Sequence, residues 1–175
     1  YATKKWAFVS DVARLWALVH EGGVYMDTDV ELVRPLDRLL TNQAFLGFEG
    51  TQWVGTNLIG AEPSHPFFIE LLKSYDHRCF ITPDGKPYQT TNVEELTRKL
   101  EKVYGFRKDG SFQQLGDITL YPTDYFCPYD YIDGQLHRTE NTYSIHWYSQ
   151  TWIKRSRWIN KLSQWMHRLT GNRMK

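Results

Sequence analysis

Gly22-Gly23-Val24-Tyr25-Met26-Asp27-Thr28-Asp29-Val30 is the stretch on which the interpretation of this sequence depends. Before it, residues 2–21 repeat apolar side chains such as Trp16 at three- and four-residue steps, the period of an amphipathic helix. The two glycines suit the end of that helix, and residues 24–26 are a candidate for a short buried strand. Alternate side chains of an extended chain share a face, so we expect Asp27 and Asp29 to point the same way.

Two carboxylates on one face repel each other, which favours a cation between them. Mg²⁺ and Mn²⁺ prefer oxygen ligands and leave coordination positions open for substrate phosphates, so one of these ions is expected here. A calcium-binding EF-hand is the rival interpretation. Counted from Asp27, however, Leu32 stands where that loop requires Gly and Arg38 where it requires Glu, which excludes it.

A wider pattern surrounds the two aspartates. It comprises Ser10-Asp11, Arg14, Gly22-Gly23, Tyr25, Asp27-Thr28-Asp29 and Pro35-Leu36. This pattern closely resembles the core signature of glycosyltransferase family 32. That family includes bacterial capsule and exopolysaccharide sugar transferases and yeast outer-chain mannosyltransferases, with the clostridial glucosylating toxins as more distant relatives.

The resemblance implies a GT-A type, Rossmann-like α/β fold and a metal-dependent, retaining transfer of a sugar from a nucleotide-diphosphate sugar. It further implies a glycan or lipid-linked acceptor, as in polysaccharide synthesis. Matching positions suggest a metal site at Asp27, Asp29 and His146. The residues that the resemblance places at the donor are Asp11, Arg14, Tyr25, Asp27, Asn57 and Trp152, of which Asp11, Arg14 and Asp27 are assigned to catalysis.

Length and composition agree with one globular catalytic domain. The chain has 175 residues, of which 41% are hydrophobic, and its formal net charge of +1 gives no sign of nucleic-acid binding. Cys79 and Cys127 lack the spacing of a metal site, and reduced thiols would suit a cytoplasmic protein. Relatives place a strand and a helix before the first helix, so we expect residues 1–152 to form a catalytic domain that lacks part of the N-terminal nucleotide-binding region.

The remaining elements are expected from periodicity and turn residues. Residues 36–40 are predicted as a short helix after Pro35, and residues 67–75 and 92–104 as longer ones, with Asn92 as N-cap. Strands are predicted at residues 30–33, 44–48, 53–59, 118–121 and 143–146.

The C-terminal residues 153–175 differ in charge from the rest. They contain Lys and Arg but neither Asp nor Glu, and Trp158, Trp165 and Leu169 fall at helical spacing. A basic amphipathic helix of this kind suits an anionic membrane surface, and equally a terminal helix packed on the domain. We therefore expect a cytoplasmic protein with peripheral attachment to the inner face of the membrane.

Two other functions fit parts of the sequence. A metal-dependent phosphotransferase or nuclease would also use paired carboxylates, but no phosphate-binding glycine loop is present. A non-catalytic carbohydrate- or membrane-binding domain with a degenerate GT-A fold remains the alternative to a glycosyltransferase.

Overall fold

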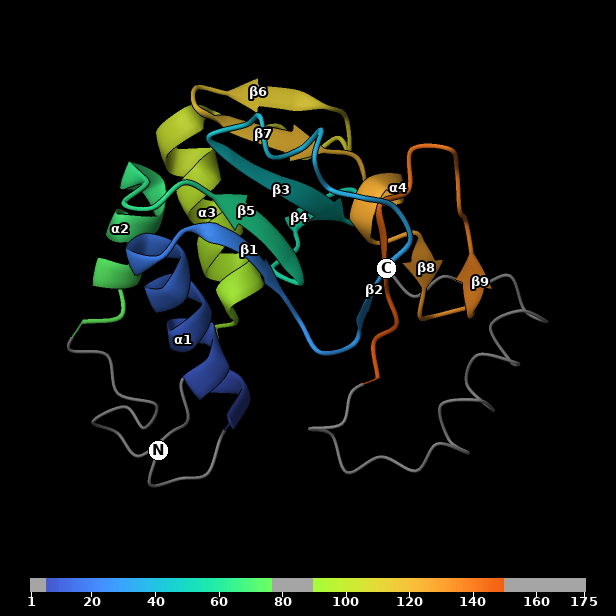
Figure 1. The fold of residues 1–175 in the computed structure, drawn as a ribbon, viewed down its shortest axis with the longest axis horizontal. Helices are drawn as coiled ribbons and strands as arrows, with labels where there is room; N and C mark the ends of the chain where they lie inside the picture. The colour runs from blue at the N-terminus through green and yellow to red at the C-terminus, as the bar shows by residue number, and fades with distance from the viewer. Residues whose placement is uncertain (1–5, 77–89, 150–175) are drawn as a thin grey trace.

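In a computed structural model of the protein, residues 6–76 and 90–149 of the 175 are described (Figure 1). Their centre is a mixed sheet in which β3 and β7 run parallel and the other pairs antiparallel. The strand order is β1 (Gly23–Met26), β5 (Leu58–Ala61), β3 (Ala44–Glu49), β7 (Ile118–Tyr121) and β6 (Gln113–Leu115), with β4 (Trp53–Val54) paired to β3. A mixed sheet with helices agrees with the predicted α/β class.

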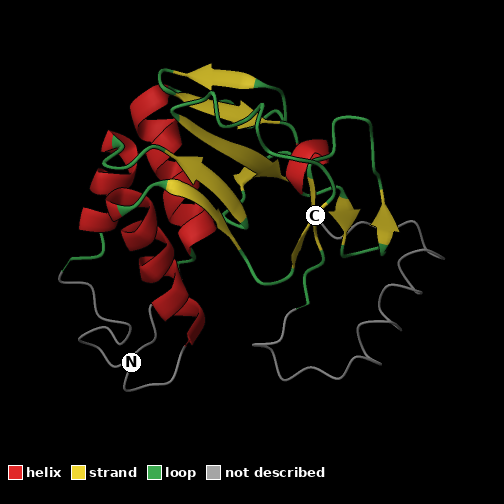
Figure 2. Cartoon of the chain, in the orientation of Figure 1, coloured by secondary structure: helices red, strands yellow, loops and turns green. Residues whose placement is uncertain are grey.

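The three long helices pack together against one face of this sheet (Figures 1 and 2). They are α1 (Trp6–His20), α2 (Pro66–Lys73) and α3 (Asn92–Tyr104). The period of two along β3 explains the packing, because Ala44, Leu46 and Phe48 all join the core that α1, α2 and α3 cover. One face of the sheet is thereby covered by helices.

The other residues of β3 face a second, smaller core. Phe45 packs there with Phe126 (ring centroids 6.0 Å apart), and Gly60 on β5 leaves the space that the Phe45 ring fills. Because side chains alternate, Glu49 at the end of β3 lies on this same face. It is the only charged residue of that strand.

Smaller elements complete this second face. They are β2 (Val30–Leu32), which pairs with β10 (Ser144–His146), the short helix α4 (Thr123–Phe126), and the hairpin of β8 (Tyr129–Asp130) with β9 (Gln135–Leu136). In the register of the first pair, His146 lies opposite Val30. A residue far along the sequence is thus brought beside the Asp27-Thr28-Asp29 turn.

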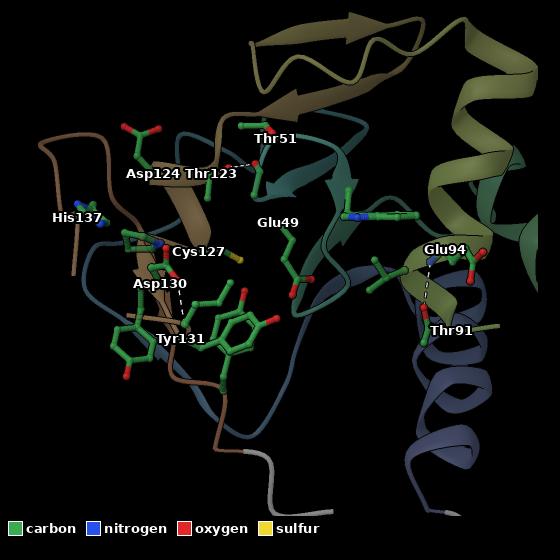
Figure 3. Close-up of a pocket in the computed structure, with 17 residues that line it drawn as sticks. Glu49, Thr51, Thr91, Glu94, Thr123, Asp124, Cys127, Asp130, Tyr131 and His137 are labelled. Carbon is green, nitrogen blue, oxygen red and sulfur yellow. Dashed lines mark hydrogen bonds between the residues drawn. The ribbon is translucent and has the colours of Figure 1, made fainter. Parts of the chain in front are cut away.

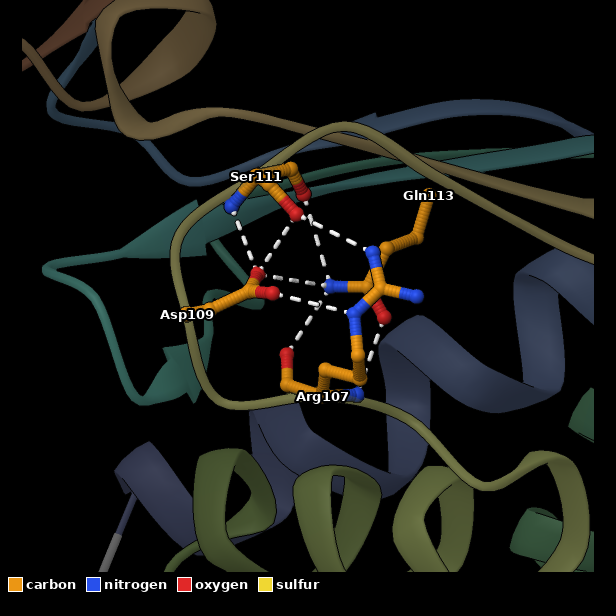
Figure 4. Close-up of polar contacts among 4 residues, drawn as sticks. All are labelled: Arg107, Asp109, Ser111 and Gln113. Atoms are coloured by element: carbon orange, nitrogen blue, oxygen red, sulfur yellow. Dashed lines mark hydrogen bonds and ion pairs between the residues drawn. The ribbon is translucent and has the colours of Figure 1, made fainter.

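The loop between α3 and β6 is held by its own polar contacts (Figure 4). Asp109 accepts hydrogen bonds from the backbone N–H (2.9 Å) and hydroxyl (2.6 Å) of Ser111 and pairs with Arg107 Nε (3.0 Å). Hydrogen bonds from Ser111 and then the Arg107 partner lower the pKa of Asp109 to about 2. This cluster belongs to the opposite edge of the sheet from β1, so Asp109 is a useful control carboxylate for experiments on the site.

The structure corrects several predicted elements. Residues 36–40 form turns and no helix, and residues 53–59 are divided between β4 and β5. Strand β6 lies between the predicted helix 92–104 and the predicted strand 118–121, where no strand was expected. The N-cap of α3 is Thr91, whose hydroxyl accepts a hydrogen bond from Glu94 N (3.2 Å), and Asn92 is the first helical residue.

Burial also differs from the prediction at the first helix and strand. Trp16 is 52% exposed and stacks on His20, whereas Leu15 and Leu18 carry the buried face of α1. Strand β1 is an edge strand, so its residues are half-buried or exposed. Of the helices in residues 6–76 and 90–149, none has the length and hydropathy needed to cross a membrane.

Candidate functional site

Arg14 is the centre of a polar network between α1 and the end of β1. Its side chain is buried, and its Nη2 lies 3.2 Å from Oδ1 of Asp11 and 3.3 Å from Oδ1 of Asp27. Its Nη1 donates to the carbonyl of Thr56 at 2.6 Å, and the guanidinium lies 4.6 Å from the centre of the Tyr25 ring. These partners lie on α1, on and just after β1, and between β4 and β5. Contacts from three parts of the chain therefore hold the guanidinium in place.

The environment shifts the titration of the groups around Arg14. Burial raises the pKa of Asp11 to about 6, although Arg14 opposes the shift, and the nearby Asp27 carboxylate adds to it. The Tyr25 hydroxyl donates to Asp27 Oδ1 at 2.7 Å, and burial raises the pKa of Tyr25 well above its ordinary range. A carboxyl with a pKa near 6 can both accept from and donate to a sugar hydroxyl near neutral pH.

Asp29 lies in a second polar group, formed where β10 passes the turn. His146 Nε2 is 3.3 Å from Asp29 Oδ1, and Ser149 donates to Oδ2 from its backbone N–H (2.8 Å) and its hydroxyl (2.9 Å). Burial by itself would raise the pKa of Asp29. The Ser149 hydrogen bonds and His146 outweigh that effect, so the pKa of Asp29 is lowered and its carboxylate stays ionised.

Asp27, Asp29 and His146 come together as predicted. One ligand atom from each residue lies within 4.8 Å of the other two. Ligands at 2.0–2.1 Å from an octahedral cation are roughly 3 Å apart when adjacent and roughly 4.2 Å when opposite. The group is therefore close to the size that Mg²⁺ or Mn²⁺ needs, and its two carboxylates are the donors that these ions prefer.

Asn57 lies beside the same turn. Its carbonyl accepts a hydrogen bond from Asp27 N (2.8 Å), and its side-chain Oδ1 accepts one from Cys127 Sγ (3.3 Å). The residue is 3% exposed, yet its Nδ2 has no hydrogen-bond partner among the described residues. A buried amide N–H without a partner is available to a ligand.

Sequence reasoning missed a third group, which adjoins the other two. Glu49 accepts a hydrogen bond from the Tyr148 side chain, and burial raises the pKa of Glu49 against the opposing effect of His146. Tyr148 has an unusual positive φ of 48°, and its ring centroid lies 3.9 Å from that of His146. The sequence did contain a signal for Glu49, because it is a carboxylate at the end of an otherwise apolar strand. Alternate side chains of a strand share a face, so Glu49 lies on the same face as Phe45.

Glu49 also lines a cavity of about 800 Å³ (Figure 3). The cavity lies between the β3–β4 turn, the start of α3 and the segment around β8, and Tyr148 contributes to its wall. Figure 3 shows Glu49 between Tyr131 on one side and Glu94 on the other. A space of this size accommodates a small-molecule ligand.

Two expectations fall on residues that are not described. Trp152, which the resemblance places at the donor, and the segment 153–175 both lie outside the described residues.

Comparison with known proteins identifies the family. Residues 1–46 match the model of the glycosyltransferase sugar-binding region containing the DXD motif. This range includes Asp11, Arg14 and the Asp27-Thr28-Asp29 turn. Mannosyl phosphorylinositol ceramide synthase of Saccharomyces cerevisiae is 42% identical over 84 residues, which cover 46% of this chain and 21% of the relative. The chain belongs to glycosyltransferase family 32.

Two other relatives of this family 32 chain are named for the transfer of different sugars. An inositol phosphoceramide mannosyltransferase of Schizosaccharomyces pombe is 39% identical over 40% of the chain and 23% of the relative. A human alpha-1,4-N-acetylglucosaminyltransferase is 26% identical over 73% of the chain and 34% of the relative. The chain thus spans between about a fifth and a third of the length of these curated relatives.

Proposed function

We propose that this family 32 chain carries the donor centre of a divalent-metal-dependent glycosyltransferase with a GT-A type fold. It would transfer a sugar from a nucleotide-diphosphate sugar to a glycan or lipid-linked acceptor, with retention of configuration, in polysaccharide synthesis. The observation that carries the proposal is the approach of Asp27, Asp29 and His146 to within 4.8 Å of one another, beside the Arg14 network.

Asp29 and His146 would hold the cation, with Asp27 as the third ligand. A bound Mn²⁺ or Mg²⁺ supplies positive charge that neutralises the leaving nucleoside diphosphate. Asp29 suits this task because its lowered pKa keeps it ionised, and because Ser149 fixes its Oδ2. Oδ1, on the His146 side, is the oxygen left to face an ion.

The neighbouring residues would orient the donor sugar. Asp11 and Arg14 offer a carboxyl and a guanidinium whose positions are fixed by the contacts described above. Asn57 offers its Nδ2 to a sugar hydroxyl. The Arg14–Asp27 pair links this group to the metal group, so that sugar and diphosphate would be held at adjacent places, which is the contribution of orientation to catalysis.

The test is metal-dependent release of nucleoside diphosphate from a panel of uridine- and guanosine-diphosphate sugars. We expect turnover with Mn²⁺ or Mg²⁺, its loss with chelator, and at least a hundredfold loss in Asp29→Asn, since the amide keeps the shape but loses the charge. Asp109→Asn removes a carboxylate from the α3–β6 loop and is the matched control. Nucleotide-sugar binding without turnover would favour the non-catalytic binding domain, and an Asp29→Asn rate within tenfold of the wild type would remove the metal role.

The membrane interpretation stays a prediction from sequence alone. We propose peripheral attachment at the cytoplasmic face through the Lys and Arg side chains of residues 153–175. Each such side chain near an anionic surface contributes about 1 kcal/mol to the free energy of membrane binding. Flotation of the chain with anionic but not with neutral vesicles is the expected result, and equal flotation with both would contradict it.

A further inference from the structure

The cavity at Glu49 is a second compartment next to the proposed donor centre. Among its lining residues, Glu49 interacts electrostatically with both Asp27 and His146. Tyr148, the hydrogen-bond partner of Glu49, packs its ring on His146 with centroids 3.9 Å apart. A molecule in this cavity would therefore lie against the residues proposed to hold the donor.

The charged side chains that line the cavity are acidic. They are Glu49, Glu94, Asp124 and Asp130, and His137 is the one ionisable base among the described lining residues. Only Glu94 among them pairs with a cation of the described residues, Arg98 (2.5 Å), while Asp124 Oδ2 accepts from the Thr139 hydroxyl (2.8 Å). Glu49 and Asp130 accept hydrogen bonds from the Tyr148 side chain and from Ile132 N. No Lys or Arg of the described part of the chain lines this wall. A phosphate or carboxylate would meet like charges here, which is costly in a confined site.

Aromatic rings supply the rest of the recognition surface. Trp53 on β4 and Tyr131 after β8 both line the cavity, and they are 43% and 46% exposed. The Tyr131 ring lies 4.8 Å from that of Tyr148, which extends the aromatic wall towards Glu49. Aromatic faces pack against the C–H face of a sugar ring, while carboxylates accept hydrogen bonds from its hydroxyls.

We infer that this cavity is the acceptor site and that it takes an uncharged glycan, selected by hydroxyl groups, in preference to a phosphorylated acceptor. The inference rests on the proposed function and narrows its acceptor class. Glu49 and Asp130 accept hydrogen bonds from the acceptor hydroxyls, and Trp53 and Tyr131 contact its ring faces. The position of Glu49 places one hydroxyl next to the donor centre.

The experiment compares sugars that differ only in a phosphate. Mannose, glucose and N-acetylglucosamine are each paired with their 6-phosphates, and binding to the full chain is measured by saturation-transfer NMR without donor. Transfer is measured with metal and whichever nucleotide sugar the chain consumes. We expect the neutral sugars to bind and to accept at least tenfold better than their phosphates. Phosphorylated sugars that bind or accept equally well, or binding by neither class, would overturn the inference.

Variants locate the effect. Tyr131→Ala should lower neutral-sugar binding, and the ratio of transfer to donor hydrolysis, at least tenfold. Asp130→Asn removes a negative charge from the wall, while its amide oxygen can still accept the hydrogen bond from Ile132 N (2.8 Å in the wild type). This variant should therefore show a smaller ratio of neutral-sugar to phosphorylated-sugar binding. Val103→Ala, at an exposed position of α3 that does not line the cavity, is the control. Unchanged binding in Tyr131→Ala would contradict the assignment.

The two proposals fail separately. If no nucleotide sugar is hydrolysed, the proposed function is wrong, whereas binding of free sugars still decides the occupant of the cavity. If donor hydrolysis proceeds but the neutral sugars neither bind nor accept, the donor centre stands and the acceptor assignment falls.

Discussion

Arg14 Nη2 lies 3.3 Å from Oδ1 of Asp27, so the first aspartate of the Asp27-Thr28-Asp29 turn is paired with a cation that the chain itself supplies. Asp29 pairs with no Lys or Arg of the described residues and instead faces His146. The two aspartates that sequence reasoning treated alike therefore have different surroundings. Asp27 joins the turn to the Arg14 network, and Asp29 is the better candidate for direct contact with a metal ion.

The first prediction concerns Arg14 as a structural residue. Arg14→Ala would leave Asp11 and Asp27 together without their buried cation and would orphan the carbonyl of Thr56. Breaking a buried ion pair costs roughly 3–5 kcal/mol, so we expect a loss of that order in the free energy of unfolding, measured by urea titration. Arg38→Ala, at an exposed position, should change stability by less than about 0.5 kcal/mol. A similar small change in Arg14→Ala would show that the network is dispensable for folding.

The second prediction is a pH dependence due to Asp11. Its folded-state pKa of about 6 lies above the ordinary 3.8, so the folded state binds the proton more tightly than the unfolded state. The stabilisation from the protonated form is fully present below about pH 4 and is lost as the pH rises through 6. The shift corresponds to a loss of about 3 kcal/mol across this window.

Asp11→Asn removes this titration and supplies the measurement. In metal-free protein without donor, the stability of Asp11→Asn relative to wild type should rise between pH 4 and pH 7. Unfolding free energies measured by urea titration at several pH values give the difference directly. Parallel curves for the two proteins would show that Asp11 has an ordinary pKa.

Much of the fold could be predicted because local patterns decide it. The first helix, the strand before Asp27, the apolar strand that begins at Ala44 and the helix that ends at Tyr104 were all expected close to their observed bounds. In each case the periodicity is strong, or a Gly such as Gly105 adopts the left-handed conformation that ends a helix. Asp27, Asp29 and His146 were also expected to meet, and they do.

The failures occurred where distant packing decides the outcome. Trp16 was expected on the buried stripe of the first helix, but the buried face carries Leu15 and Leu18, which pack in a core built from α2 and the sheet, far along the sequence. Glu49 was overlooked for the same reason. Its partner Tyr148 follows β10 and is brought to Glu49 by the pairing of β10 with β2. No local sequence pattern predicts that contact.

The third prediction tests the packing that supports the second face. An added Cβ at Gly60 would overlap the ring of Phe45, although the backbone at Gly60 needs no positive φ. Gly60→Ala should therefore destabilise the protein by about 1–3 kcal/mol through overpacking. The control Gly105→Ala meets no atom within 4 Å but has a φ of 64°, so it should cost about 1 kcal/mol from backbone strain alone.

A double variant separates packing from strain. Phe45→Leu should recover part of the loss when combined with Gly60→Ala, because the smaller side chain vacates the space that the new methyl group needs. The same change should give no recovery in Gly105→Ala. Strictly additive effects of Phe45→Leu and Gly60→Ala would rule out the overlap.

The fourth prediction addresses Asn57, whose Nδ2 is buried without a partner among the described residues. If this N–H donates to a hydroxyl of the donor sugar, Asn57→Ala should weaken binding of the nucleotide sugar at least tenfold, or about 1.4 kcal/mol, and leave the affinity for the bare nucleoside diphosphate unchanged. Calorimetric titration of both ligands with Mn²⁺ gives the two affinities. Cys127→Ser keeps a donor to Asn57 Oδ1 and is the matched control for the amide's surroundings. If Asn57→Ala weakens the binding of both ligands equally, the amide contacts the diphosphate or supports the structure of the site, and does not contact the sugar.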